Sequence, residues 1–181
     1  MCKTKNIFIA LFVLFFLAYG NAKADANQSL ISKVSFGRAA DVDILLAQKA
    51  NPNATNSAGL SAVFIAAARS DAEAPKIISS LIKAGADVNF ASPNGGLPII
   101  EAVRSGNPQN VKLLIDGGAA MSVKDLRGND LTKIAQNRSD DKIITLVQAG
   151  IAAEQKKLGS LKSCHNYIKQ LILQKIQRSY L

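Results

Sequence analysis

The chain repeats itself, and this internal repetition constrains its fold more strongly than any other feature of the sequence. A polar turn residue followed three positions later by glycine occurs three times, as Asn56 to Gly59, Ser92 to Gly95 and Asp125 to Gly128. The three glycines are separated by 36 and 33 residues. Spacings of this size are typical of solenoids, in which each short unit buries its apolar face against its neighbours.

Each unit is predicted to contain a turn, a helix, a second turn, a second helix and a loop. Asn56, Ser92 and Asp125 are residue types that cap a turn by bonding to its backbone, and the glycine that follows accepts positive φ. The Val/Ile-x-Leu-Leu pattern, as at 111–114, gives the second helix one apolar face. Aromatic residues make up only 6% of the chain and Trp is absent, which suits closely packed helices. We therefore predict an all-α helix-turn-helix solenoid of about four repeats.

The repeated pattern resembles the ankyrin repeat. The segment 84–89, Ala-Gly-Ala-Asp-Val-Asn, agrees with the end of that family's motif, while Pro98 keeps its proline and Ser61 stands for its threonine. The family's His is replaced by Phe64, Ile100 and Lys133, so either these turns are looser or packing by Phe64 substitutes for the hydrogen bonds. The resemblance implies an ankyrin-type solenoid with repeats at about 28–54, 55–91, 92–124 and 125–151.

Residues 1–24 have the order of a secretory signal peptide. Lys3 and Lys5 precede an unbroken apolar run over 7–18, and Ala22-Lys23-Ala24 supplies the small residues that a signal peptidase reads. The run is shorter than the roughly 20 residues that cross a bilayer as a helix. We expect cleavage before Asp25 and export, either to the periplasm or out of the cell. An uncleaved anchor is the alternative.

Residues 152–181 are predicted to form a basic amphipathic C-terminal helix. Its apolar residues recur at three- and four-residue steps and would share one face: Leu158, Leu161, Cys164, Ile168, Leu171, Ile172 and Ile176. One interpretation is a cap that packs over the last repeat and seals the solenoid. The other is an interaction segment that lies on an anionic membrane surface or docks on a partner.

The formal net charge of +9 lies mostly outside the repeats. Residues 25–151 carry 13 basic and 12 acidic residues, whereas residues 152–181 carry six basic residues and one acid. Because a nucleic-acid-binding protein usually carries its basic residues on the folded reading face, we do not expect nucleic acid as a partner.

Catalytic and metal-binding patterns are not found in the sequence. His165 is the only histidine, and Cys164 would be the only cysteine of a chain cleaved before Asp25. Adjacent helical residues point about 100° apart, so this pair cannot act as nucleophile and base on one helix. We expect a monomeric protein that is not an enzyme and holds no cofactor or metal.

The resemblance implies a protein-binding module that holds another protein on a concave face lined by turn tips and first helices. Carrying the family's variable positions over to this sequence selects Arg69, Arg104 and Arg127, and arginine and aromatic side chains are enriched at binding hot spots. A solvated rim without a partner is the alternative. The predicted partner-binding residues are Phe90, Asn94, Arg104, Lys124, Leu126 and Arg127.

Two biological roles agree with this prediction. One is a periplasmic inhibitor, immunity or protective factor that holds a toxic or redox partner. The other is a secreted effector that binds host proteins. A scaffold attached to a membrane surface by residues 152–181 is a third alternative.

Overall fold

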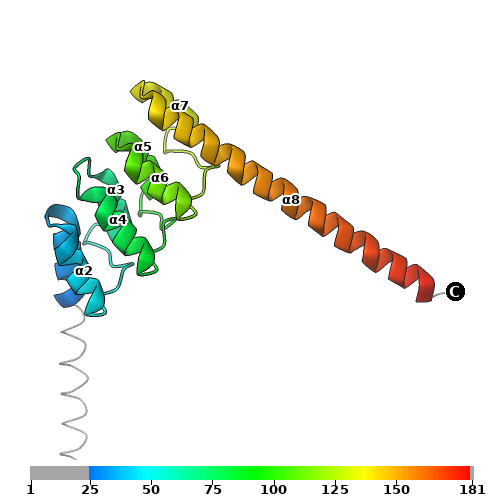
Figure 1. Ribbon diagram of the computed structural model, residues 1–181, viewed down its shortest axis with the longest axis horizontal. Helices are drawn as coiled ribbons and strands as arrows, with labels where there is room; N and C mark the ends of the chain where they lie inside the picture. The colour runs from blue at the N-terminus through cyan, green and yellow to red at the C-terminus, as the bar shows by residue number, and fades with distance from the viewer. Residues whose placement is uncertain (1–24, 180–181) are drawn as a thin grey trace, which may run out of the picture.

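The computed structural model describes residues 25–179, so the expected signal peptide over 1–24 lies outside it. Helices stand in antiparallel pairs, and the pairs stack side by side along one axis (Figure 1). The predicted all-α helical solenoid is confirmed. A helix over 25–36 is followed by α2 (Ala39–Ala47), α3 (Ala62–Ala68), α4 (Ala74–Lys83), α5 (Pro98–Ser105), α6 (Pro108–Asp116), α7 (Leu131–Arg138) and α8 (Asp141–Ser179).

The turns that precede α3, α5 and α7 have the predicted chemistry. The Asn56 Oδ1 atom accepts hydrogen bonds from the backbone N–H groups of Ala58 and Leu60, at 3.0 and 2.9 Å. Ser92 and Asp125 accept equivalent bonds from the backbone of their own turns. The three turn glycines have φ of +73°, +74° and +77°, a region that side chains with a Cβ disfavour.

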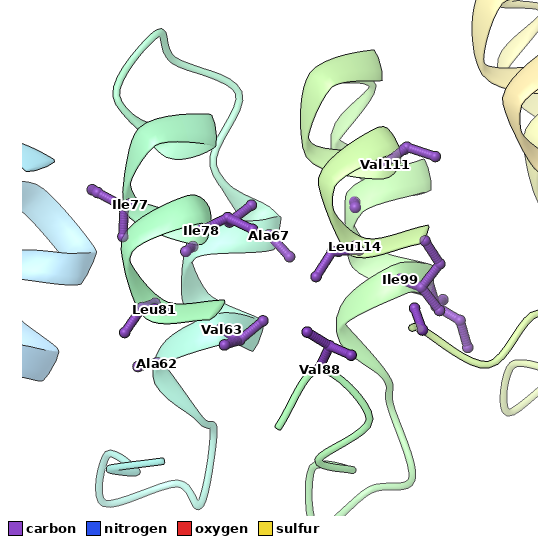
Figure 2. Close-up of a cluster of buried hydrophobic side chains, with 14 of the residues drawn as sticks. Ala62, Val63, Ala67, Ile77, Ile78, Leu81, Val88, Ile99, Val111 and Leu114 are labelled. Carbon is purple, nitrogen blue, oxygen red and sulfur yellow. The ribbon is translucent and has the colours of Figure 1, made fainter. Parts of the chain in front are cut away.

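The core is continuous from one helix pair to the next. Ile77, Ile78 and Leu81 of α4 are fully buried, as is Val63 of α3, and Ile77 points toward the preceding helix pair (Figure 2). Small buried residues, such as Ala66 and Ala102, let the first helices of neighbouring units approach closely. The core residues that the structure describes, together with those packed against them, lie between Ala26 and Ile151. A chain that begins at Asp25 therefore keeps all of them.

The loops between units are connected by side chains that accept hydrogen bonds from the next loop's backbone. Asn53 accepts from the N–H of Asp87 at 2.7 Å, and Asn89 accepts from the N–H of Ala120 at 2.8 Å. At the end of the stack Glu154 takes this role, accepting from the N–H of Met121 at 3.1 Å. These bonds satisfy loop donors that the helices leave unpaired.

The C-terminal segment differs from the prediction. The expected boundary between residues 151 and 152 falls inside α8, which is one helix from Asp141 to Ser179. Gly150 does not end this helix, and it packs against Met121, whose Cε atom would lie 2.8 Å from an added Cβ. The first part of α8 closes the stack, with Ile143 and Val147 buried.

The expected cap over 152–181 is not seen in the described residues. Residues 155–165 are exposed, and α8 extends away from the helix pairs (Figure 1). Residues 155–165 lie beyond the loops that join the units, so none of the described helix pairs covers them. None of the helices in the described residues carries an apolar stretch of the length needed to cross a membrane.

Candidate functional site

The tips of successive turns lie against one another in a row. A Cβ added to Gly59 would lie 2.5 Å from the Cγ atom of Pro93 in the next turn. One added to Gly95 would lie 3.9 Å from a methyl group of Leu126 in the turn after that. The glycines thus leave room for the following tip, and they place Leu126 next to the tip that contains Asn94.

A polar hollow of about 210 Å³ lies between the third and fourth units. Two of the predicted residues, Arg104 and Arg127, line it together, and Leu126 is the neighbour of Arg127 in the same turn. The remaining lining residues are Asp125, Asn129, Ile134, Asn137 and Arg138. Three arginines lie here with two carboxylates, Asp125 in the hollow and Glu101 on Arg104, so the hollow keeps one net positive charge and favours an anionic group.

Arg104 connects the third unit to the turn of the fourth. Its guanidinium forms ion pairs with Glu101 at 2.8 Å and with Asp125 at 3.0 Å. The Arg104 side chain is 46% exposed, whereas that of Asp125 is 5% exposed. Arg104 therefore fixes the turn through Asp125 and still presents part of its side chain to a partner.

The pKa of Asp125 is lowered from its ordinary value by its hydrogen bonds. Burial alone raises the pKa, but the N–H groups of Asn129 and Arg127, the Asn129 amide and the Arg104 guanidinium all donate to the carboxylate. The charged form is favoured, which keeps the ion pair with Arg104 intact.

The other predicted residues are distributed around this hollow. Leu126 is 80% exposed at the tip of its turn, and Asn94 is exposed at the preceding tip. Lys124 is exposed at the base of the turn that carries Leu126, where its backbone pairs with that of Asp130. Phe90 is half-buried in the loop after α4 and does not line the hollow. The structure thus brings Arg104 and Arg127 together in the hollow, places Leu126 at the tip of the same turn as Arg127, and leaves Phe90 apart.

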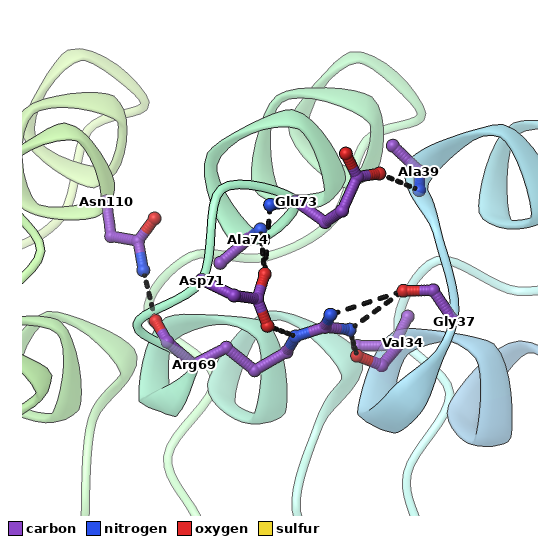
Figure 3. Close-up of polar contacts among 8 residues, drawn as sticks. All are labelled: Val34, Gly37, Ala39, Arg69, Asp71, Glu73, Ala74 and Asn110. Atoms are coloured by element: carbon purple, nitrogen blue, oxygen red, sulfur yellow. Dashed lines mark hydrogen bonds and ion pairs between the residues drawn. The ribbon is translucent and has the colours of Figure 1, made fainter.

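Arg69 does not serve as an exposed anchor, contrary to the prediction. Its side chain is 14% exposed and donates hydrogen bonds to the carbonyls of Val34 and Gly37, at 2.6 and 3.2 Å (Figure 3). It also forms an ion pair with Asp71 at 2.8 Å. Arg69 therefore binds the end of the preceding unit's first helix, whose last carbonyls have no helical partner.

Sequence reasoning missed a group of polar residues that, like Arg69, bond to backbone groups of the preceding unit. Asn110 is fully buried and donates from Nδ2 to the Arg69 carbonyl at 2.8 Å (Figure 3). Glu73 accepts a 2.8 Å bond from the N–H of Ala39 in the preceding unit. One feature of the sequence could have indicated Asn110. It occupies the repeat position that Ile77 holds one unit earlier, so a polar residue stands where an apolar one is expected.

Phe64 lies where the ankyrin motif has histidine, and it acts by packing. A Cβ added to Gly96 in the next turn would lie 3.2 Å from the Phe64 ring. The ring therefore fills the space beside the third unit's turn. This agrees with the alternative in which packing substitutes for the histidine's hydrogen bonds.

Comparisons with known proteins agree with this architecture. A family model described as ankyrin repeats (3 copies) matches residues 30–125, which is more than half of the chain. A comparison with curated protein sequences finds no significant match. Ankyrin repeats form a protein-binding module that is generally non-catalytic. The chain belongs to the ankyrin-repeat family.

Proposed function

We propose that this protein is an exported, non-catalytic module that binds one partner protein at the third and fourth units. The observation that carries the proposal is the position of Leu126, an exposed apolar tip between Asp125 and Arg127, which line the hollow together with Arg104. An isolated turn needs only small polar residues, so a largely exposed leucine beside two arginines is better explained by a contact. Arginine is also enriched among the residues that dominate binding energy.

The chemistry of the hollow indicates what the partner presents there. Arg104, Arg127 and Arg138 outnumber the two carboxylates that pair with Arg104, so an Asp, a Glu or a terminal carboxylate would be favoured. An apolar side chain next to that carboxylate would cover Leu126. The partner is therefore a protein with an acidic group beside an apolar one on a projecting segment.

The proposed setting is outside the cytoplasm, in a role of the inhibitor, immunity or protective type. The order of basic, apolar and small residues over 1–24 supports export, and a protein that only binds can act by holding its target. Cell fractionation with intact-mass measurement tests this proposal. A chain beginning at Asp25 in the periplasm supports it, the same chain in the medium favours the secreted effector, and a chain beginning at Met1 in the cytoplasm refutes export.

Site-specific photo-crosslinking tests the binding face. A photoreactive amino acid is placed at Leu126 and, as the matched control, at Gln148, which is exposed on the outer helix α8. Crosslinking in intact cells should give one adduct of defined mass from position 126 and none from position 148. An adduct from position 148 alone would move the partner to the outer face.

A further inference from the structure

Helix α8 divides at Glu154 into a part that belongs to the stack and a part that does not. Glu154 is the last residue tied to the preceding unit, with its carboxylate accepting from Met121 and from the Ser122 hydroxyl at 2.5 Å. Every residue over 155–165 is exposed, and the helix continues to Ser179.

The face that the stack buries continues in register along the exposed part. Steps of four, three, four, four and three residues lead from Ile143 through Val147, Gly150 and Glu154 to Leu158 and Leu161. Such steps keep residues on one side of a helix. Leu158 is 48% exposed and Leu161 58% exposed, whereas on the same side of the helix Gly150 is buried and Glu154 is half-buried. An apolar surface that continues a buried one requires something to cover it.

The charge of this segment limits what that cover can be. Residues 155–179 contain six basic residues, Lys156, Lys157, Lys162, Lys169, Lys175 and Arg178, and no Asp or Glu. A second copy of the helix would bring two sets of like charges together. The occupant must therefore carry negative charge.

The shape of the segment favours a lipid surface over a protein helix. The shallow hollow at Leu158 and Leu161 is completed by Lys162 and His165, so all of its walls come from α8. A protein helix is normally held in a groove with walls from two or more elements, whereas a fluid bilayer adapts to a single convex face.

We propose that the second half of α8 lies along an anionic bilayer surface. Leu158 and Leu161 would enter the acyl boundary, while Lys162 and Lys169 would extend to the lipid phosphates. At 1.5 Å per residue, residues 155–179 would extend over about 37 Å of membrane. The inference is independent of the proposed partner site, since residues 155–165 do not line the hollow between the third and fourth units.

Vesicle co-sedimentation tests this inference with the chain from Asp25 to Leu181. The vesicles contain phosphatidylcholine alone or phosphatidylcholine with about 30% phosphatidylglycerol. We expect binding to the anionic vesicles only, and weaker binding as salt is raised. Lys162→Gln with Lys169→Gln should lower the partition coefficient about 25-fold, roughly fivefold for each charge. Leu158→Gln with Leu161→Gln should abolish binding.

The matched control removes two lysines from the body of the protein. Lys83→Gln with Lys142→Gln changes the net charge equally at exposed positions of α4 and α8, and it should change the partition coefficient less than twofold. Circular dichroism melting verifies that each variant folds. Three results would overturn the proposal: no sedimentation of the wild type with anionic vesicles, equal loss in the control, or binding to an acidic amphipathic peptide without binding to vesicles.

Discussion

The guanidinium of Arg69 donates a 2.6 Å hydrogen bond to the carbonyl of Val34, which lies in the last turn of the preceding unit's first helix. Two units later Arg138 repeats this relationship by donating to the Arg104 carbonyl at the end of α5. Between them, Asn110 binds the Arg69 carbonyl from the second helix. Each step of the stack thus has a polar side chain that satisfies a helix end one unit earlier.

Arg69→Ala should lower the free energy of unfolding by about 1.5–3 kcal/mol, the range for hydrogen bonds made by charged groups. The cause is the loss of bonds to Val34 and Gly37 at a site that is mostly buried. Urea denaturation of the chain from Asp25 measures the change. Arg127→Ala is the matched control, because it removes an exposed arginine and should change stability by less than about 0.5 kcal/mol. Equal effects of the two variants would contradict the structural role of Arg69.

Lys49→Gly should stabilise the protein by up to about 1 kcal/mol. Lys49 has φ of +66° at the end of α2, where the next two units have Gly85 and Gly118 at +87° and +88°. The left-handed conformation costs a non-glycine residue about 1–2 kcal/mol, and glycine's greater freedom when unfolded offsets part of the gain. Gly85→Ala tests the same effect in reverse, since an added Cβ there meets no atom within 4 Å. If Gly85→Ala leaves the melting temperature unchanged, backbone strain is not the cause.

Arg104→Ala with Arg127→Ala should weaken partner binding by about 1–2 kcal/mol, a typical effect for anchor residues. Arg127→Ala alone should account for part of this loss without changing stability. Arg104→Ala should also lower the melting temperature, because it removes the ion pair with Asp125, whose side chain is only 5% exposed. Calorimetric titration with the purified partner, paired with melting curves, separates the two effects. Wild-type affinity in the double variant would place the partner elsewhere.

Truncation should distinguish the two parts of α8. A chain that ends after Gly150 loses Ile151, which packs against the core, and Glu154, which binds Met121 and Ser122. Its melting temperature should fall. A chain that ends after Gln155 keeps these contacts and loses only residues that are exposed over 156–165, so its melting temperature should match the wild type. A large loss in the longer truncation would show that the exposed part of α8 contributes to the fold.

Stability should decrease in acid as four carboxylates are protonated. Hydrogen bonds hold the pKa of Asp71, Glu73, Asp125 and Glu154 below their ordinary values of 3.8 for Asp and 4.5 for Glu. For Glu154 the donors are the Ser122 hydroxyl and the Met121 N–H. A carboxylate with a lowered folded pKa stabilises the protein above its unfolded pKa, and this contribution is lost as the pH falls through the folded value.

Glu154→Gln should reduce this acid dependence. The melting temperature of the wild type should fall as the pH is lowered from about 5 to 3, and it should fall less steeply in the variant. Asp43→Asn, which removes an exposed carboxylate on α2, is the matched control and should follow the wild type. Parallel curves for Glu154→Gln and the wild type would contradict the assigned role of Glu154.

Local chemistry was sufficient to predict the repeat architecture. The capped turns at Asn56, Ser92 and Asp125 depend on bonds within five residues, and the turn glycines depend on their own backbone angles. Helical periodicity then identified the apolar face of each second helix, because the residues of that face are three and four positions apart. Arg104, Leu126 and Arg127 could be proposed for one binding face, because the resemblance implies that turn tips and first helices line the same concave face.

Contacts between units could not be predicted from local chemistry, because they join residues that are far apart in the chain. Arginine at position 69 suggested an exposed binding residue. Its side chain instead donates to carbonyl groups that are more than 30 residues away in the chain, so its role could not be predicted locally. Asn110 is buried by the same stacking. The predicted boundary after residue 151 also depended on tertiary contacts. Gly150 stays helical where it packs against Met121, and α8 continues past it. Short-range bonds that can be read along the chain shape each unit, whereas the path of α8 and the role of each arginine depend on which unit lies beside it.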